Sequence, residues 1–243
     1  MLELANQTLL IIAPHPDDEV LGCGGLIKQI KDKGGKVFVL FLTVGDTADY
    51  RKEGLSTPIQ SVSTGSERMR EIDRVAKFMR YDDYRIAFPG NKYHLRLDEI
   101  AQLDLMKEFE NGPLSLNKLK PDIVATPYFS DYNQDHRAAT MALFGATRPT
   151  PDDQKPLQRV ILGYESVPTA GWWDSSGSKM NFYLHLTDEE LKAKMKGLEL
   201  YTSQVRTGNH PRALASIKKL AAMRGIESGV GAAVAFYSYR MII

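Results

Sequence analysis

The sequence predicts an α/β fold in which helices cover both faces of a mostly parallel sheet. Short apolar runs alternate along the chain with segments whose apolar residues recur at helical spacing. The runs are apolar throughout, as is typical of strands that are buried on both faces. The 243 residues lie at the upper end for one such unit, and the only Pro/Asp-rich break is at 149–156. We therefore expect a Rossmann-like fold in a single domain spanning residues 1–243.

In the first half of the chain, residues 8–13 form the first expected strand. A helix follows from near Glu19 to the Gly34-Gly35 pair, where glycine ends it. A second strand is expected at 36–43, then a polar loop at 46–64, and loops of this length are often functional. The next helix is predicted from an apolar stripe formed by Met69, Ile72, Val75 and Met79. Arg68, Glu71 and Arg74 lie away from this stripe.

The second half continues the alternation. Strands are expected at 84–88, 122–127 and 159–164, with a closing segment at 232–239. The expected helices are 97–109, 136–147, 188–201 and 211–223, and residues 128–134 form a loop before the second of them.

Composition excludes several classes of partner. The net charge is +1 and no Lys/Arg stripe is present, so we expect no nucleic-acid partner. The only cysteine, Cys23, excludes an intramolecular disulfide, suits a reducing cytoplasm and is expected in the core. No charged region precedes the apolar run at 8–12, which is too short to span a bilayer. We expect a cytoplasmic protein without a membrane span, for which homo-oligomerisation stays open.

The most informative segment is Ala13-Pro14-His15-Pro16-Asp17-Asp18-Glu19, between the first strand and its helix. The corner after a strand is where α/β sheets place their ligands. One histidine and two aspartates packed there are costly to hold unless a positive ion binds them. We interpret the corner as half of a divalent metal site, with zinc as the expected ion.

Two other interpretations of this corner fit its residues less well. Gly22-Cys23-Gly24-Gly25 resembles the end of a dinucleotide fingerprint, in which a helix N-terminus accepts a pyrophosphate. The acidic side chains would repel that phosphate, and the glycines also suit close helix–sheet packing. Simple helix capping would need one aspartate, not two preceded by His-Pro.

The second half of the site is predicted at another strand end. Residues 130–137 follow the strand at 122–127 and include His136. His15, Asp18 and His136 would supply two nitrogens and one carboxylate to one metal ion and leave a position for water. Asp17 would act as the general base on that water. Taken alone, His136 also fits a histidine at a helix start that bonds the backbone.

These motifs, with Asp135-His136 as the second, resemble the LmbE-like or PIG-L zinc-dependent N-deacetylases, which remove acyl groups from aminosugar derivatives. The Asn209-His210-Pro211-Arg212 and Arg224-Gly225 blocks extend the resemblance over most of the chain. It implies zinc ligands at His15, Asp18 and His136, a base at Asp17 and a sugar-hydroxyl contact at Arg68. Asp135 is expected to orient its neighbours. One Zn²⁺ per chain is expected, and Fe²⁺ or manganese also suits such ligands.

The sequence departs from the family pattern in two places. The second motif usually reads His-x-Asp-His, and its first histidine is replaced here by Asn133. An amide can donate a hydrogen bond to an oxyanion but carries no titrating proton. Protonation of the amine is then expected from Asp17 or from another group such as His210. Near the end, AVAF at 233–236 replaces a commonly acidic AEAF pattern.

The substrate expected from the resemblance is a small aminosugar or sugar conjugate with an N-acetyl or N-formyl group. The segments 48–64 and 166–178 could frame the pocket, and Trp172 and Trp173 suit stacking on a sugar, although packing of one in the core fits equally. His210 either binds substrate or belongs to a helix start with Pro211 in its first turn. A metal hydrolase of non-sugar amides, a degenerate sugar-binding protein and a nucleotide-binding enzyme remain as alternatives.

Overall fold

The computed structural model describes residues 3–47, 63–151, 153–173 and 180–242. It contains one seven-stranded sheet with the order β3-β2-β1-β4-β5-β7-β6. The strands are β1 (Thr8–Ala13), β2 (Lys36–Val44), β3 (Asp83–Pro89), β4 (Ile123–Pro127), β5 (Val160–Tyr164), β6 (Phe182–His185) and β7 (Ala233–Met241). The first five strands are parallel, and β7 runs antiparallel between β5 and β6. The predicted α/β class and mostly parallel sheet are confirmed.

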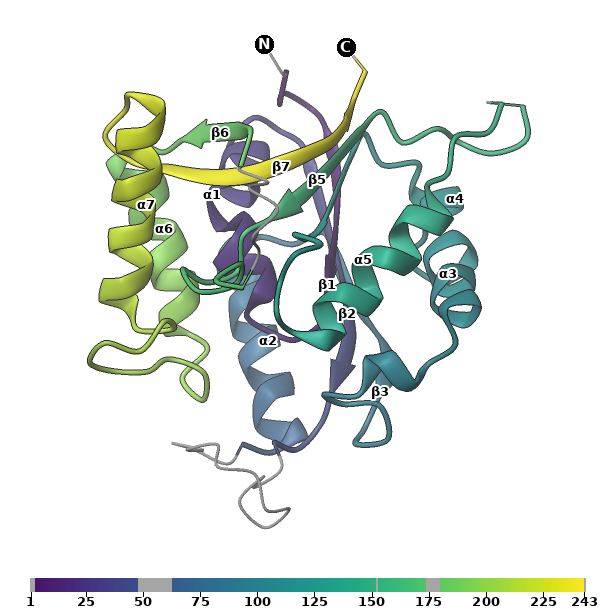
Figure 1. Ribbon diagram of the computed structural model, residues 1–243, viewed down its shortest axis with the longest axis horizontal. Coiled ribbons are helices and arrows are strands. Elements are labelled where there is room, and N and C mark those ends of the chain that lie inside the picture. The colour runs from purple at the N-terminus through teal and green to yellow at the C-terminus, as the bar shows by residue number, and fades with distance from the viewer. Residues whose placement is uncertain (1–2, 48–62, 152, 174–179, 243) are drawn as a thin grey trace.

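Helices form a layer on each face of the sheet (Figure 1). One face is covered by α1 (Asp18–Asp32), α2 (Gly65–Met79), α6 (Asp188–Glu199) and α7 (Leu214–Ser228). The other carries the 3-10 helix η2 (Leu97–Glu99), α3 (Gln102–Asn111), α4 (Leu116–Leu119) and α5 (Gln134–Ala146). Within β1, Leu9 and Ile11 face the first layer, and Leu10 and Ile12 face the second. This explains why the strand is apolar throughout: both faces are buried.

The glycines after the first corner pack α1 closely against its neighbours. A Cβ atom at Gly22 would lie 2.2 Å from the Tyr164 ring, and one at Gly25 would lie 2.3 Å from Leu186. Cys23 is fully buried and free, as expected. The glycines therefore allow close packing of α1 against the sheet and its connections.

Three element predictions are corrected by the structure. The helix expected at 97–109 is broken between η2 and α3, where Ile100 has an extended backbone (φ −83°, ψ 132°). The helix expected at 211–223 runs from Leu214 to Ser228, and Gly229 ends it in the left-handed region (φ 76°). Strand β6 was not predicted at all.

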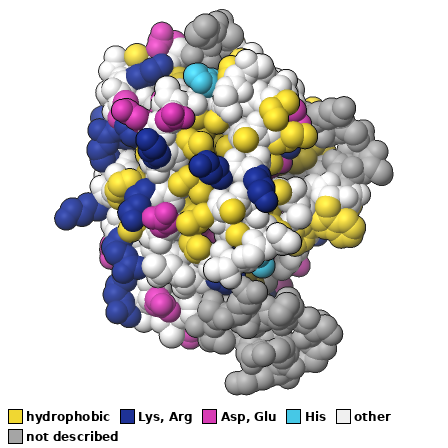
Figure 2. Space-filling model, turned by 90° about the vertical axis from the view of Figure 1, so that its left-hand side faces the viewer, with side chains coloured by type: hydrophobic (Ala, Val, Ile, Leu, Met, Phe, Trp, Pro, Cys, Tyr) yellow, Lys and Arg dark blue, Asp and Glu magenta, His cyan; other side chains and the backbone are white. Residues whose placement is uncertain are grey.

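Of the two predicted pocket-framing segments, 48–64 lies outside the described residues except for 63 and 64, whereas 166–178 lies outside them only at 174–178. Trp172 is 77% exposed and Trp173 is 50% exposed, which corrects the alternative that one of them packs in the core. Figure 2 shows the side of the molecule formed by α6 and α7, where Lys and Arg side chains are interspersed with hydrophobic and acidic ones.

None of the helices within the described ranges has the length and apolar character that crossing a membrane requires.

Candidate active site

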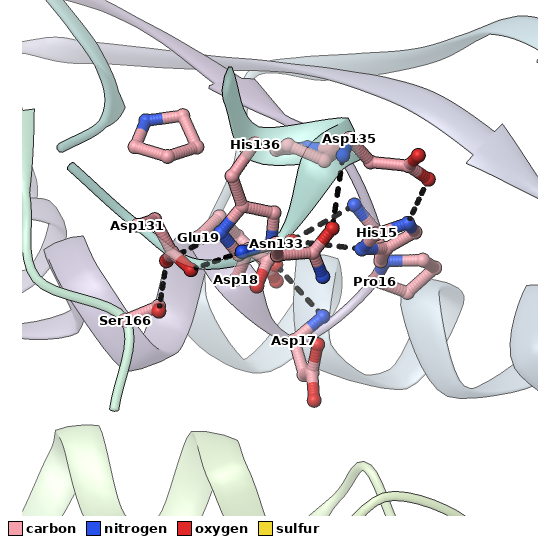
Figure 3. A network of polar contacts seen from close by, with 12 residues as sticks. His15, Pro16, Asp17, Asp18, Glu19, Asp131, Asn133, Asp135, His136 and Ser166 are labelled. Atoms are coloured by element: carbon pink, nitrogen blue, oxygen red, sulfur yellow. Dashed lines mark hydrogen bonds and ion pairs between the residues drawn. The ribbon is translucent and has the colours of Figure 1, made fainter. Parts of the chain in front are cut away.

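The two sequence motifs meet because β1 and β4 are neighbours in the sheet. Leu9 pairs with Ile123 and Ile11 with Ala125, so the two strands end at the same edge. Strands β2 and β3 are added on one side of β1, and β4 and β5 on its other side. The point between β1 and β4, where the direction of winding reverses, is where doubly wound sheets form their binding crevice. The corner before α1 therefore lies against the corner before α5 (Figure 3).

His15, Asp18 and His136 form a buried cluster at this edge. Each offers one ligand atom, and these atoms all lie within 4.8 Å of one another. Asp18 Oδ2 is 3.4 Å from His15 Nδ1 and 3.2 Å from His136 Nε2. An ion with tetrahedral bonds of 2.0–2.1 Å has ligand atoms roughly 3.3 Å apart. The two spacings around Asp18 therefore suit a small tetrahedral cation.

Each histidine ring is held by a second carboxylate on its far side. His15 Nε2 lies 2.8 Å from Asp135 Oδ2, and His136 Nδ1 lies 2.7 Å from Asp131 Oδ2. These contacts leave His15 Nδ1 and His136 Nε2 facing Asp18, an arrangement common around protein metal sites. The structure thus places Asp135 where an orienting residue was expected. Asp131 was missed, and its only signal was its position five residues before His136.

Buried polar atoms of the cluster lack hydrogen-bond partners in the part of the chain that the structure describes. His136 Nε2 and Asp18 Oδ1 are buried, and neither has a hydrogen-bond partner among the described residues. Burial opposes protonation of His136, but Asp18 and Asp131 outweigh it and raise the pKa of this ring to about 10. Burial also opposes ionisation of Asp18, yet the two histidines hold its pKa well below the usual range. A divalent cation would satisfy the unpaired atoms and the carboxylate charge together, so the residues fit a metal ion.

Asp17 lies beside this cluster in a strained backbone conformation. Its φ of 111° and ψ of −27° are rare for a residue with a side chain, and such strain gathers at functional sites. Oδ1 is buried with no partner in the described part of the chain, and Oδ2 is 3.5 Å from Arg212 Nη1. Burial raises the pKa of Asp17; the nearby Arg212 lowers it and Asp18 raises it further. A carboxylate of this kind is suited to exchange a proton.

Asn133 begins α5 as its N-cap. Its Oδ1 accepts from the Asp135 amide at 2.9 Å, and its own backbone amide donates to Asp131 Oδ1 at 2.9 Å. The capping bond occupies the acceptor end of the side chain, so the Nδ2 group is the end suited to donate to a ligand. Its expected contribution to oxyanion stabilisation remains a prediction.

Arg68 is buried although it lies away from the apolar stripe of α2, and its Nη2 donates to the Pro16 carbonyl at 2.6 Å. This bond ties α2 to the first corner. Arg68 Nε is also buried without a partner in the described chain. Its contact with sugar hydroxyls stays a prediction.

His210 lies in a turn before α7. Its Nδ1 accepts from the Arg212 amide at 3.0 Å, and α7 begins only at Leu214, so the helix-start interpretation with Pro211 in the first turn is wrong. The turn instead directs Arg212 toward Asp17. Arg212 also donates to Gln204 Oε1 at 3.1 Å.

His94 was missed entirely by sequence reasoning. It is buried, its ring meets His15 edge-on with centroids 5.8 Å apart, and its Nδ1 is 3.2 Å from Thr43 Oγ1. Burial, with the positive charge of His15 and Arg68, lowers its pKa to about 3, so the ring is neutral at physiological pH. A lone histidine in a loop offers no periodicity or motif that could have indicated this position.

The comparisons with known proteins agree with these motifs. Residues 10–147 match the family model described as PIG-L, GlcNAc-PI de-N-acetylase. The chain is 26% identical over 178 residues to the uncharacterized deacetylase YaiS of Escherichia coli, covering 70% of this chain and 80% of that protein.

Two further similarities extend this result. The 1D-myo-inositol 2-acetamido-2-deoxy-alpha-D-glucopyranoside deacetylase of Kribbella flavida is 23% identical over 167 residues, which are 58% of this chain and 55% of that protein. This chain therefore matches about half the length of that relative. The N,N'-diacetylchitobiose deacetylase of Pyrococcus horikoshii has a similar structure, with a TM-score of 0.68, 21% identity, and coverage of 96% of this chain and 83% of that chain. The resemblance inferred from the motifs is confirmed.

Proposed function

Because this chain belongs to the PIG-L family, we propose that it is a metal-dependent deacetylase that hydrolyses the amide of an N-acylated aminosugar derivative. The observation that carries the proposal is the buried His15, Asp18 and His136 cluster with Asp17 beside it. The named relatives from Kribbella and Pyrococcus act on acetylated sugars, which supports a sugar substrate here. We propose an acetyl or formyl group as the one removed.

In this proposal, His15, Asp18 and His136 hold one Zn²⁺ or Fe²⁺ ion. Such an ion lowers the pKa of water and polarises the amide carbonyl when it is bound. Asp131 and Asp135 fix the two histidine rings so that the correct nitrogens face the ion.

The remaining residues act on the substrate and its protons. Asp17 accepts a proton from the attacking water and later delivers it to the departing amine. In this proposal, the strained backbone conformation of Asp17 keeps its carboxylate beside the reacting atoms. Asn133 donates through Nδ2 to the oxyanion that forms from the carbonyl oxygen. Arg68 and His210 bind the sugar, and Arg212 keeps the Asp17 carboxylate in place.

The first experiment measures metal content and acetate release together. We expect about one zinc or iron per chain, lost in both His15→Ala and His136→Ala, and hydrolysis of N-acetylglucosamine conjugates. Asp17→Asn should retain the metal and lose about 10²- to 10⁴-fold in turnover. Asparagine tolerates positive φ better than most residues, which makes this a conservative change of the strained position.

The possible results separate the proposal from its rivals. Failure of the wild-type protein to take up metal would overturn the hydrolase proposal and favour a sugar-binding protein. Hydrolysis of N-acetyl amino acids but not of acetylated sugars would replace the sugar by another amide. Full turnover in Asp17→Asn would remove Asp17 from the role of base.

A further inference from the structure

Glu19 is a buried carboxylate that the proposed hydrolysis does not use. It follows Asp18 in the first turn of α1, and its exposed fraction is 0%. Burying a carboxyl group is costly unless its oxygens are bonded. A glutamate that only stabilised the start of α1 could do so from the surface, where water would solvate it. The burial of Glu19 therefore needs an explanation in the contacts that it makes.

Both oxygens of Glu19 accept hydrogen bonds. Oε1 accepts from the hydroxyl group of Tyr81 at 3.0 Å and from that of Tyr201 at 2.5 Å. Oε2 accepts from the backbone amide of Asp17 at 3.1 Å (Figure 3). Tyr81 lies just after α2 and Tyr201 just after α6. Residues that follow two separate helices thus hold one end of the carboxylate, while its other end holds Asp17.

The bond to Glu19 completes a clamp on the peptide unit between Pro16 and Asp17. The carbonyl of this unit accepts from Arg68 Nη2 at 2.6 Å, and its amide donates to Glu19. On the other side of Asp17, the Asp17 carbonyl accepts from the Leu21 amide at 2.9 Å. Hydrogen bonds therefore hold both peptide units that flank the Asp17 Cα atom. Because φ and ψ are the rotations between these two planar units, the bonds fix the direction of the Cα–Cβ bond.

This clamp accounts for the backbone conformation of Asp17. A φ of 111° is unfavourable for a residue with a Cβ atom, so surrounding contacts must impose it. Arg212 lies 3.5 Å from Asp17 Oδ2, at the far end of the side chain. Glu19 instead holds the backbone from which that side chain projects.

We propose that Glu19 is a positioning residue for the general base. With two tyrosine hydroxyl groups as its anchors, it fixes the peptide unit before Asp17 so that the Asp17 carboxylate stays beside the metal-binding cluster. Glu19 acts through Asp17 and does not reach the reacting atoms itself. Its effect on turnover rests on the proposed deacetylase function, whereas its effect on the backbone of Asp17 does not.

The kinetic test compares Glu19→Met with Glu19→Gln, with acetate release from N,N'-diacetylchitobiose as the readout. Methionine has no oxygen for the Asp17 amide, so kcat should fall about 10- to 100-fold, with KM within about twofold of wild type and the metal content unchanged. Glutamine keeps one oxygen for that amide, and its NH₂ group can donate to the tyrosine oxygens, which accept as well as donate. Glu19→Gln should therefore keep kcat within about threefold of wild type.

Thr147→Val is the matched control for the loss of a buried hydrogen bond. Thr147 donates to the Leu143 carbonyl at the end of α5 away from the site, and the variant should keep kcat within about twofold. Full kcat in folded Glu19→Met, or equal losses in the two Glu19 variants, would overturn the proposal.

A second variant replaces Glu19→Met if that protein does not fold. Tyr81→Phe combined with Tyr201→Phe removes both anchors and keeps the carboxylate. This double variant should lose about threefold or more in kcat. Full kcat in the folded double variant would also overturn the proposal.

Amide hydrogen exchange at Asp17, measured by NMR, tests the positioning without any substrate. The Asp17 amide should be protected in wild type and in Glu19→Gln, and should exchange at least about tenfold faster in Glu19→Met. This pattern in a protein that releases no acetate would retain the positioning role and refute the proposed function. Acetate release by the wild type, with unchanged exchange in Glu19→Met, would overturn the positioning role alone.

Discussion

Replacing Asp131 by asparagine tests whether the outer carboxylates set the metal affinity. Asp131 Oδ2 faces His136 Nδ1 at 2.7 Å and accepts from Ser166 Oγ, whereas Oδ1 accepts from the Asn133 amide at 2.9 Å. An asparagine has one oxygen and one NH₂ group, so it cannot accept on both sides. If the oxygen faces His136, the NH₂ group opposes the Asn133 amide. If the NH₂ group faces His136, the ring must carry its proton on Nε2.

Both orientations weaken a metal site. The second one places a proton on His136 Nε2, the nitrogen that would bind the ion. The first one costs roughly 1–3 kcal/mol for an unpaired buried donor and disturbs the corner before α5. Loss of such an outer partner typically lowers metal affinity about 10- to 100-fold, and we expect Asp131→Asn to fall in this range.

The assay is a zinc titration against a competing chelator at constant pH, with circular dichroism to show that the variant is folded. Ser166→Ala is the matched control, because it removes one hydrogen bond from Asp131 Oδ2 and leaves the carboxylate in place. We expect the control to lose less than about threefold in affinity. Unchanged affinity in Asp131→Asn would refute the assigned orientation of His136.

Two stability predictions concern the packing around α1. Gly22→Ala should destabilise the fold by about 1–3 kcal/mol in urea denaturation, since the added Cβ would meet the Tyr164 ring at 2.2 Å. Gly171→Ala is the control and should have little effect, because no atom lies within 4 Å of its added Cβ. Equal stabilities of the two variants would contradict this packing. Burial lowers the pKa of Lys194 from 10.5 to about 8. Between these pH values the unfolded chain therefore binds more protons than the folded chain. The free energy of unfolding of the wild-type protein should rise with pH over this range, by up to about 3 kcal/mol. Lys194→Met should remove that rise and the exposed Lys192→Met should retain it, so parallel pH profiles for the two variants would refute the assignment.

Much of the fold could be predicted because strand formation in a covered parallel sheet has a local signal. Residues 9–13 and 37–42 are apolar throughout, and β1 and β2 extend only one or two residues beyond them. The edge strand β6 is half-buried and only four residues long, so it has no comparable signal. It is a strand because β7 pairs with it along its whole length.

The limits of the predicted helices were less accurate than those of the strands. The residues at 97–109 have a helical pattern, but the extended backbone of Ile100 separates η2 from α3. The apolar pattern does not reveal this break, because Ile100 is buried in the core like the helical residues around it. Gly229, by contrast, ends α7 through its own positive φ, a preference that the residue itself carries.

The sequence by itself determined the chemistry of the first corner, because His15, Asp17 and Asp18 are neighbours whose spacing alone brings them to one strand end. It also indicated His136 as the partner, since parallel strands end at a common edge. Only the tertiary structure decided that Asp131 holds His136, that His94 meets His15 and that Arg212 reaches Asp17. These contacts depend on how separate elements pack and on the direction of each side chain, whereas sequence patterns report the local backbone and the burial of a face.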